Sequence, residues 1–535
     1  MAFATARSLA LRGADGHVID VQVDVSPGIV ATTLVGRVDK SLSEARDRVR
    51  MAINNDCGRW PATKRVTILL APADLPKSGT HYDLAIAVAV LAADKAAEEL
   101  TPDLLEGWAF IGELSVSGGL RPVPGVLPMV IAAAARGIDR VFVPEPQAGE
   151  AGLVPGMTVV GVRSLAQVAA VLTGAEVPEA PPVAEVSARP LAGWRGEDRL
   201  AEVDLADLDG LEDVRFAVEV AAAGCHPLML VGPRGTGKTS IAERIPTILP
   251  DLTTEQSLEV TALHSVAGVL PDGAGLLHRP PWFAPHHGAS GASVLGGGTG
   301  RVRPGQVSLA HHGVLFLDEF PHFRSDVIDA LRQPLESGEV TIARGEASAT
   351  YPARSLVVLA ANPCPCGNFY GHGPLAGQCE CSEVQRHHYR RKLTGPILDR
   401  VDVWMEVRPH GRTGPTVGRP VESSADVRAR VTEARQRQAR RYHGCGWQLN
   451  AFVPGPALAE HWPLPSEAQC LLDDELAAGT LSRRGMTRVQ RLAWTLADCA
   501  GASRPGEEQA QTALVLRSAD PSRSLPARVA ETVAS

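Results

Sequence analysis

The sequence lacks any long apolar run. No stretch of eighteen uncharged apolar residues occurs in its 535 residues, and no apolar segment of signal-peptide type follows Met1. Membrane spanning and secretion are therefore not indicated, and we expect a cytoplasmic protein without a membrane partner. An excess of positive charge is missing too, because the formal net charge is −8. Any contact with nucleic-acid phosphates must then come from local basic elements.

A disulfide framework is not indicated either. The nine cysteines comprise four in a tight cluster and five single ones. In a reducing compartment this distribution indicates one metal site and ordinary buried thiols. Internal repeats are absent, and the one biased stretch, rich in Pro, Ala and Glu, lies at 176–203. We expect that stretch to be an extended linker.

The chain is too long for a single core, so two or three domains are expected. We predict an α/β protein in which residues 1–175 mix strand and helix patterns, 204–409 alternate them, 410–520 form a mainly helical lid and 521–535 a loose tail. Within the first segment, strands are predicted at His17–Val25, Val66–Leu70 and Arg140–Val143, and helices at Asp83–Ala93 and Met129–Ala135.

The most informative stretch is GPRGTGKT, which follows the apolar run Leu228–Val231. Its glycines let backbone N–H groups curl around phosphates at a positive helix N-terminus. Lys238 would reach the outer phosphates of ATP, and the Thr239 hydroxyl would ligate Mg²⁺. The predicted ATP-binding residues are Gly232, Pro233, Arg234, Gly235, Thr236, Gly237, Lys238 and Thr239.

Two further strand patterns end in polar residues suited to ATP hydrolysis. GVLFLDE ends in Asp318, which would hold Mg²⁺, and Glu319, which would polarise the attacking water. A second buried strand, Leu356–Ala361, is followed by Asn362, which could orient that water. Together with the phosphate-binding loop, these residues predict a nucleoside triphosphatase.

Two arginines complete the predicted catalytic set. Arg400, in TGPILDRVD, is suited to project at the γ-phosphate of a neighbouring subunit. Arg484, near a helix start in LSRRGMTR, could reach the γ-phosphate from the lid, with Arg488 one turn away as a weaker candidate. The alternative for each arginine is a solvated charge on a helix.

Longer motifs carry a family resemblance. PHHGASGASVLGGG, PGQVSLAHHGVLFLDEF, LRQPLESGEVTIAR, YPAR, ANPCPCG and TGPILDRVD are similar to those of the magnesium-chelatase-like AAA+ family of competence protein ComM and YifB. The resemblance covers nearly the whole chain. It implies an AAA+ ATPase with a three-layer αβα core that assembles with ATP into a homo-hexameric ring. ComM-type members are implicated in DNA branch migration during natural transformation, so DNA is the implied partner.

The resemblance also implies two elements that face the ring pore. The first would lie in about Leu258–Pro304 and the second in about Gly338–Tyr351. The residues support a hairpin in the second, because Glu339–Ala343 alternates and Gly345 can turn. Arg344 near its tip would then contact DNA phosphates. The alternative is an exposed arginine on a turn.

His286 and His287 are metal-ligand types, but adjacent residues of an extended backbone point to different sides, and we expect no acidic partner nearby. We therefore favour a packing or pore-loop role for both histidines.

The first segment resembles the Lon-protease-type fold in DLPKSGTHYDLAIAVAVLAA and IGELSVSGGLRPVPGVLPMVIAAAARG. Lon-type proteolysis needs a serine activated by a lysine. His81 stands in the place of that serine and Leu127 in the place of the lysine. We expect no protease activity and instead a scaffold, DNA-guiding or partner-docking role.

The clustered cysteines form CxC, twelve residues, then CxC, and could supply four thiolates to a structural, tetrahedral Zn²⁺. The loop between the two pairs is rich in Gly and Pro, so we expect it to need a cross-link such as Zn²⁺ to adopt one conformation. The alternatives are free thiols, or His372 in place of one thiolate. The four residues are Cys364, Cys366, Cys379 and Cys381.

Ala425–Tyr442 has a helical pattern with six arginines, which could lie along a phosphate backbone or a neighbouring subunit; a solvated helix face is equally compatible. Taken together, the residues and the resemblance favour a DNA-translocating motor of the helicase or branch-migration type. Two alternatives are a chelatase-type or protein-remodelling ATPase, and a regulatory ATPase or scaffold that does not thread DNA.

Overall fold

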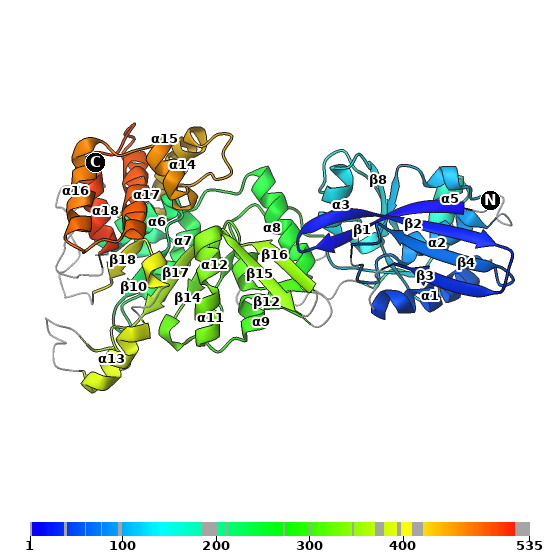
Figure 1. Ribbon diagram of the computed structural model, residues 1–535, viewed down its shortest axis with the longest axis horizontal. Helices are drawn as coiled ribbons and strands as arrows, with labels where there is room; N and C mark the ends of the chain where they lie inside the picture. Colours follow the sequence, from blue (N-terminus) through cyan, green and yellow to red (C-terminus); the bar gives the residue numbers. More distant parts are fainter. Residues whose placement is uncertain are drawn as a thin grey trace.

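The structure is a computed structural model, and it has two main sheets in different parts of the chain (Figure 1). The N-terminal part, the nucleotide-binding core and the C-terminal helices follow one another along the long axis of the molecule. The predicted mixed α/β class is confirmed. The described residues are 3–36, 40–58, 60–75, 77–94, 99–184, 202–208, 211–270, 273–298, 302–344, 347–369, 379–392, 397–408 and 421–518.

A seven-stranded mixed sheet organises the N-terminal part, in the order β3-β4-β2-β1-β5-β8-β9. Helix α2 (Asp83–Ala93) is apolar on all sides and every one of its residues is buried, as expected of a helix inside a core. The predicted strands and helices all occur, although α3 begins three residues before Met129. Their bounds are β1 Phe3–Arg12, β2 Asp15–Ser26, β3 Ala31–Val35, β4 Arg65–Ala71, β5 Trp108–Phe110, β8 Arg140–Pro144, β9 Thr158–Val162, α1 Lys40–Ala52, α3 Val126–Ala134 and α5 Leu165–Thr173.

A five-stranded sheet forms the second part, in the order β11-β14-β17-β10-β18. All neighbouring strands are parallel. The residues of β14 and β17 are buried throughout, which suits strands covered on both faces. Because the strands are parallel, their carboxyl ends share one edge, where α/β proteins bind ligands. The bounds are β10 Leu228–Val231, β11 Trp282–Phe283, β14 Val314–Leu317, β17 Leu356–Ala361 and β18 Val403–Glu406.

Helices of the C-terminal region share one apolar core with this sheet. Val489 and Leu492 of α17 belong to the same buried cluster as Leu228 of β10, so these helices are packed on the core rather than held apart from it. Of the helices within the described residues, none is long and apolar enough to span a bilayer. The bounds are α6 Glu212–Gly224, α7 Lys238–Ile248, α8 Thr254–Ala267, α14 Ser424–Arg441, α15 Gly455–His461, α16 Ser466–Ala477, α17 Arg483–Cys499 and α18 Glu507–Arg517.

The predicted hairpin is present as β15 (Glu339–Arg344) and β16 (Ala347–Pro352), paired from Glu339↔Pro352 to Arg344↔Ala347. Gly345 and the side chain of Arg344 lie outside the described residues. On one face Ile342 and Tyr351 are buried, whereas Thr341 and Thr350 on the other face are exposed. Of the residues that the structure describes, the exposed face of the hairpin carries the small and hydroxyl side chains of Thr341, Ala343, Ser348 and Thr350; Glu346, in the turn beside Gly345, is outside the described residues.

The bounds predicted for the first pore element, about Leu258–Pro304, are partly wrong because they include a strand of the core sheet. Trp282–Phe283 forms β11, a core strand that pairs with β14. The three apolar residues between Pro281 and Pro285 are too short a run to show strand periodicity. The other described pieces of this segment are the end of α8, α9 (Gly291–Val294), β12 (Gly296–Gly297) and β13 (Arg303–Pro304).

The N-terminal part contacts both predicted pore elements. Leu11 and Ala14, at the turn between β1 and β2, pack against the apolar cluster that contains Ile342 of the hairpin. The Ser265 hydroxyl of α8 donates a 2.5 Å hydrogen bond to Glu150 Oε1. Most of the predicted linker and all of the tail 521–535 lie outside the described residues.

Candidate nucleotide site

The predicted ATPase residues meet at the carboxyl edge of the five-stranded sheet. The phosphate-binding loop follows β10, Asp318 and Glu319 follow β14, and Asn362 follows β17. The register places Leu317 opposite Leu359 and Val231 opposite Ala361, so the three strands end together. This arrangement brings the loop, the acidic pair and the asparagine into one site.

The loop backbone needs its glycines. Gly235 has φ +79° and Gly237 φ +84°, in the left-handed region, and nothing lies within 4 Å of a Cβ built at either position. Backbone conformation, not crowding, therefore requires glycine there. Helix α7 begins directly after Gly237, at Lys238, so its free N–H groups face the loop, as anion binding requires.

Lys238 lies folded into this loop. Its Nζ donates to Gly232 O at 2.7 Å, to Pro233 O at 2.6 Å and to Asn362 Oδ1 at 3.2 Å. Burial lowers the pKa of Lys238, although the charges of Asp318 and Glu319 oppose that shift. Phosphate oxygens are stronger partners for an ammonium than these carbonyls, so the residues fit ATP.

Thr239 and Asp318 already meet where a magnesium ion would bind. Thr239 Oγ1 donates to Asp318 Oδ2 at 2.9 Å. Mg²⁺ prefers oxygen ligands and is commonly held by one or two protein groups together with substrate phosphates. The pair therefore fits Mg²⁺ bound with ATP, in agreement with the predicted ligands.

Glu319 has an unusual backbone and two histidine neighbours. Its φ is +50°, a region that non-glycine residues occupy mainly where the surroundings impose it. Glu319 Oε2 lies 3.4 Å from His287 Nδ1 and 3.4 Å from His322 Nδ1. The prediction of no acidic partner is therefore wrong for His287, because β11 and β14 are neighbours and the loops after them meet.

The two predicted catalytic arginines lie together, away from their own phosphate-binding loop. Arg400 Nη2 is 2.5 Å and Arg484 Nη2 3.3 Å from Glu336 Oε1. Arg400 precedes β18, which runs parallel to β10, so it stands at the amino edge of the sheet. Four strand residues, about 13 Å, separate that edge from the loop. This placement suits contact with a neighbouring subunit for both arginines, and Arg484 reaches it from helix α17 of the C-terminal region.

Arg488 has a different setting. It is buried, and its Nη1 contacts Asp402 and donates to Arg400 O at 2.7 Å. Asp402 Oδ2 is also 2.8 Å from His226 Nδ1. Arg488 therefore stabilises the junction beneath Arg400, and the weaker catalytic alternative for it is not supported by its position.

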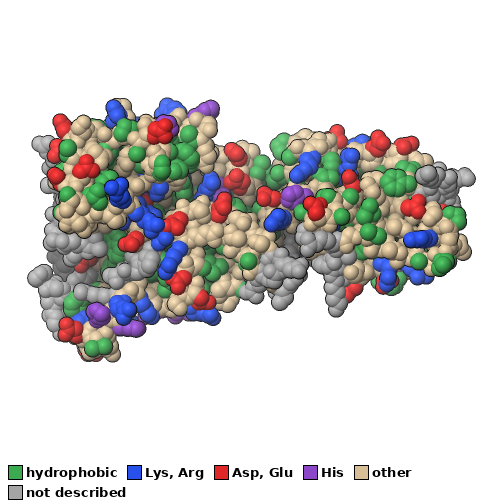
Figure 2. All heavy atoms as spheres, in the orientation of Figure 1, with side chains coloured by type: hydrophobic (Ala, Val, Ile, Leu, Met, Phe, Trp, Pro, Cys, Tyr) green, Lys and Arg blue, Asp and Glu red, His purple; other side chains and the backbone are tan. Residues whose placement is uncertain are grey.

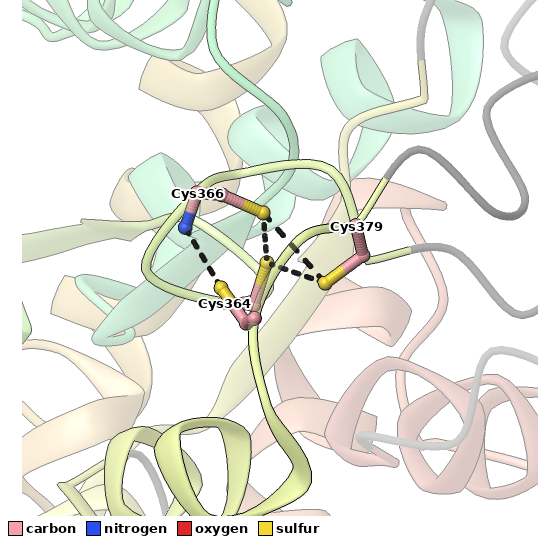
Figure 3. Close-up of side chains that lie close together, drawn as sticks. Cys364, Cys366 and Cys379 are labelled. Atoms are coloured by element: carbon pink, nitrogen blue, oxygen red, sulfur yellow. Dashed lines mark hydrogen bonds between the residues drawn. The ribbon is translucent and has the colours of Figure 1, made fainter.

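The four clustered cysteines converge, and Figure 3 shows three of them, Cys364, Cys366 and Cys379, with their sulfur atoms close together. The Sγ atoms of Cys364 and Cys366 are 3.3 Å apart, and each is 3.7 Å from Cys379 Sγ. With Zn–S bonds of about 2.3 Å, a tetrahedral site has sulfur separations of about 3.8 Å. Cys381 Sγ lies within 4.8 Å of the other three sulfurs. The set therefore fits one structural Zn²⁺; His372 lies outside the described residues.

This cysteine loop adjoins the nucleotide site. A Cβ built on Gly367 would lie 3.3 Å from Arg234 Cγ in the phosphate-binding loop. Cys364 is also only two residues beyond Asn362. A metal that orders the cysteine loop would thus support the wall of the ATP site.

A second group of residues that could bind a metal, Glu259, His311 and His312, forms hydrogen bonds among its own side chains. His311 Nε2 and His312 Nε2 lie 3.2 and 2.8 Å from Glu259 Oε2. The backbone N–H of Arg354 donates to His311 Nδ1 at 3.0 Å. His311 Nδ1 therefore carries no proton, and its Nε2–H must be the donor to Glu259. That nitrogen is not free to ligate a metal.

The arginine-rich helix α14 uses its charges internally. Arg428 pairs with Asp251, Arg430 with Glu219 and Glu422, and Arg441 with Asp498, while Arg435 and Arg437 donate to Ala222 O and Asp498 O. Five of the six arginines thus hold the helix to the rest of the molecule. Figure 2 shows basic and acidic side chains interspersed over the visible face, so α14 is not favoured as a nucleic-acid contact.

In the N-terminal part, the two residues that stand in the places of the protease serine and lysine, His81 and Leu127, have packing and hydrogen-bond contacts of their own. Leu127 is buried in the apolar core, and His81 Nε2 lies 2.7 Å from Leu9 O. Lys77 Nζ donates to Pro72 O, and the hydroxyls of Ser115 and Ser117 contact each other at 2.9 Å.

Comparison with known proteins finds matches over nearly the whole chain. Family models for magnesium chelatase, subunit ChlI, match residues 204–413, with related ChlI models at 21–147 and, for the C-terminal region, 421–517. An uncharacterised protein of Mycobacterium tuberculosis is 44% identical over 97% of this chain and 99% of its own length. YifB of Escherichia coli is 39% identical over 93% of this chain and 94% of its own length. Competence protein ComM of Haemophilus influenzae is 37% identical over 94% of this chain and 94% of its own length. The likeness to these relatives thus extends over 93–97% of this chain.

Proposed function

The chain belongs to the ComM and YifB family of magnesium-chelatase-like proteins, and from that premise we propose that it is an ATP-hydrolysing ring motor that moves along DNA during recombination. The convergence of Lys238, Asp318 and Asn362 at one sheet edge carries the ATPase part of the proposal. The family suggests ATP and Mg²⁺ as the nucleotide and its ion.

The division of labour follows the positions of the side chains. The loop 232–239 would hold the phosphates, Thr239 and Asp318 the Mg²⁺, and Glu319 the attacking water. Arg400 and Arg484 would complete the site of the next subunit, because both stand at the sheet edge opposite their own loop. Each site is then made by two copies of the chain, which is the reason for proposing a ring.

The hairpin β15–β16 is the proposed DNA contact. Its exposed face carries small and hydroxyl side chains, including Thr341 and Thr350, and Arg344 ends the first strand. Contact with the phosphate backbone needs cations and little base-edge chemistry. We propose that the N-terminal part, a Lon-like domain without its dyad, serves as a scaffold or guide for this hairpin, since it packs against it.

The first test is the steady-state ATPase rate of the full chain with Mg²⁺, with and without single-stranded or forked DNA, using Glu319→Gln as the blank. We expect DNA to raise the rate severalfold and Arg344→Ala to abolish the increase while basal hydrolysis survives. Arg440→Ala is the matched control, because Arg440 is an exposed arginine of α14. Hydrolysis that is indifferent to every DNA would favour a chelatase-type or protein-remodelling ATPase instead.

A further inference from the structure

One carboxylate joins the two arginines at the amino edge of the nucleotide-binding sheet. Glu336 Oε1 accepts a hydrogen bond of 2.5 Å from Arg400 Nη2 and lies 3.3 Å from Arg484 Nη2. The two arginines come from different elements, because Arg400 precedes β18 and Arg484 belongs to the first turn of α17. Glu336 is therefore the side chain through which they meet.

The backbone that carries Glu336 is held in place by the core. Glu336 belongs to the short helix α12 (Arg332–Ser337). Leu331, directly before this helix, is buried in the same apolar cluster as Val401, the residue after Arg400. Because a packed interior keeps its parts in fixed relative positions, the fold holds Glu336 and Arg400 at a constant separation.

The second arginine depends more strongly on the carboxylate. The side chain of Arg400 is 9% exposed, whereas that of Arg484 is 55% exposed. Two guanidinium groups on one oxygen also repel each other. Without the negative charge of Glu336 between them, we expect the Arg484 side chain to turn into solvent, where more rotamers are open to it.

The cluster remains attractive to an anion. One carboxylate between two arginines leaves one positive charge in excess, and phosphate oxygens are strong partners for guanidinium groups. A guanidinium group has five N–H donors, so a bond to Glu336 does not prevent Arg484 from binding phosphate as well. The carboxylate can therefore orient the arginines without occupying them fully.

We propose that Glu336 is a positioning residue for hydrolysis in the neighbouring subunit: its carboxylate holds the guanidinium groups of Arg400 and Arg484 side by side, so that both meet the γ-phosphate bound by the next copy of the chain. This inference rests on the proposed function and deepens it. Donors that are already oriented stabilise the charge of the transition state without a cost of reorganisation. Glu336 itself touches neither ATP nor the attacking water.

The first test is the variant Glu336→Gln, which keeps the shape of the side chain and removes its charge. We expect kcat to fall by about 10–100-fold, as for other small misplacements of a catalytic group, with the KM for ATP and the thermal midpoint unchanged. Glu467→Gln is the matched control, because Glu467 is an exposed glutamate of α16, and it should keep the wild-type kcat. The rates are measured without DNA, so they do not depend on the DNA part of the proposed function.

Subunit mixing then locates the effect. When Glu336→Gln is mixed with Lys238→Ala, we expect the ATPase rate per Glu336→Gln chain to rise, because the Lys238→Ala neighbour supplies both arginines with their carboxylate. Mixing with Arg400→Ala should give no such rise, because both variants then have a defective arginine face. A merely structural role of Glu336 would lower the thermal midpoint and would not depend on which partner is mixed in.

The outcomes distinguish the inference from the proposed function. A wild-type kcat in Glu336→Gln overturns the inference. An equal effect of the two mixing partners also overturns it, and the shared site still stands if Lys238→Ala and Arg400→Ala complement each other. If those two variants do not complement each other, the shared site of the proposed function is refuted, and the inference with it.

Discussion

Removing one partner of the buried Asp402 network should destabilise the junction between the nucleotide-binding core and the C-terminal helices. Asp402 is fully buried, contacts Arg488 Nη1 of α17 and lies 2.8 Å from His226 Nδ1. Breaking a buried pair leaves an uncompensated charge and costs about 3–5 kcal/mol. For a unit of this size that cost corresponds to a fall of roughly 6–20 °C in the thermal midpoint.

The measurement is urea and thermal unfolding of Arg488→Met, Asp402→Asn and the double variant, followed by the tryptophan emission of the protein. Each single variant should lose about 3–5 kcal/mol, and the double variant should lose clearly less than the sum, since it removes both charges. Arg483→Met is the matched control, because Arg483 is exposed on the same helix, and it should stay within about 0.5 kcal/mol of wild type.

The same network sets a dependence on pH. Burial alone would raise the pKa of Asp402, but the charge of Arg488 and the hydrogen bond to His226 outweigh it and hold that pKa well below its ordinary value. The stabilising contribution is therefore complete above the unfolded pKa, near 4, and is lost as pH falls toward the folded pKa. Single losses below about 1 kcal/mol, or additive losses in the double variant, would refute the reasoning.

Three further expectations follow from the site. Purified protein should hold about one zinc per chain by elemental analysis, and Cys364→Ser should lose it whereas the exposed Cys470→Ser should not; a zinc-free wild type would contradict this. Lys238→Ala and Arg400→Ala should each be inactive alone and regain part of the ATPase rate when mixed. In a mixed ring, an Arg400→Ala subunit supplies an intact phosphate-binding loop and a Lys238→Ala neighbour supplies the arginine; no recovery would argue against a shared site. Burial lowers the pKa of His264 to about 4, so between pH 6.5 and 4 the unfolded chain binds a proton that the folded chain does not, and stability should fall with pH by up to about 1.4 kcal/mol per unit. Substituting His264→Gln should flatten that slope in unfolding measured across this range.

Local patterns predicted several elements with the ends that the structure gives them, namely Leu228–Val231, Leu356–Ala361 and Asp83–Ala93. The two strands are uninterrupted apolar runs bounded by polar, Gly or Pro residues, and the helix is an apolar run between Asp83 and Asp94. The length and the ends of each element can therefore be predicted from residues that are close in sequence. The family resemblance, confirmed by the comparisons, supplied the order of the motifs.

Contacts that depend on strand order were not predictable in the same way. His287 and Glu319 are 32 positions apart, and they meet only because the two-residue strand β11 lies beside β14. Arg484 and Arg400 meet on Glu336 because α17 docks at the amino edge of the sheet. No periodicity encodes which edge a later helix will cover, and the pairing of the α14 arginines has the same origin.

The position of Arg400 and Arg484 at the edge opposite the phosphate-binding loop has a consequence for stoichiometry. The face that carries Arg400 and Arg484 would contact a different face, the one that carries the phosphate-binding loop, on the next subunit. Such head-to-tail contacts form either closed rings or open filaments. An open filament has one complete active site fewer than it has subunits, and a monomer has none. The ATPase rate per chain should therefore rise steeply with protein concentration and reach its maximum only when all subunits are in closed rings.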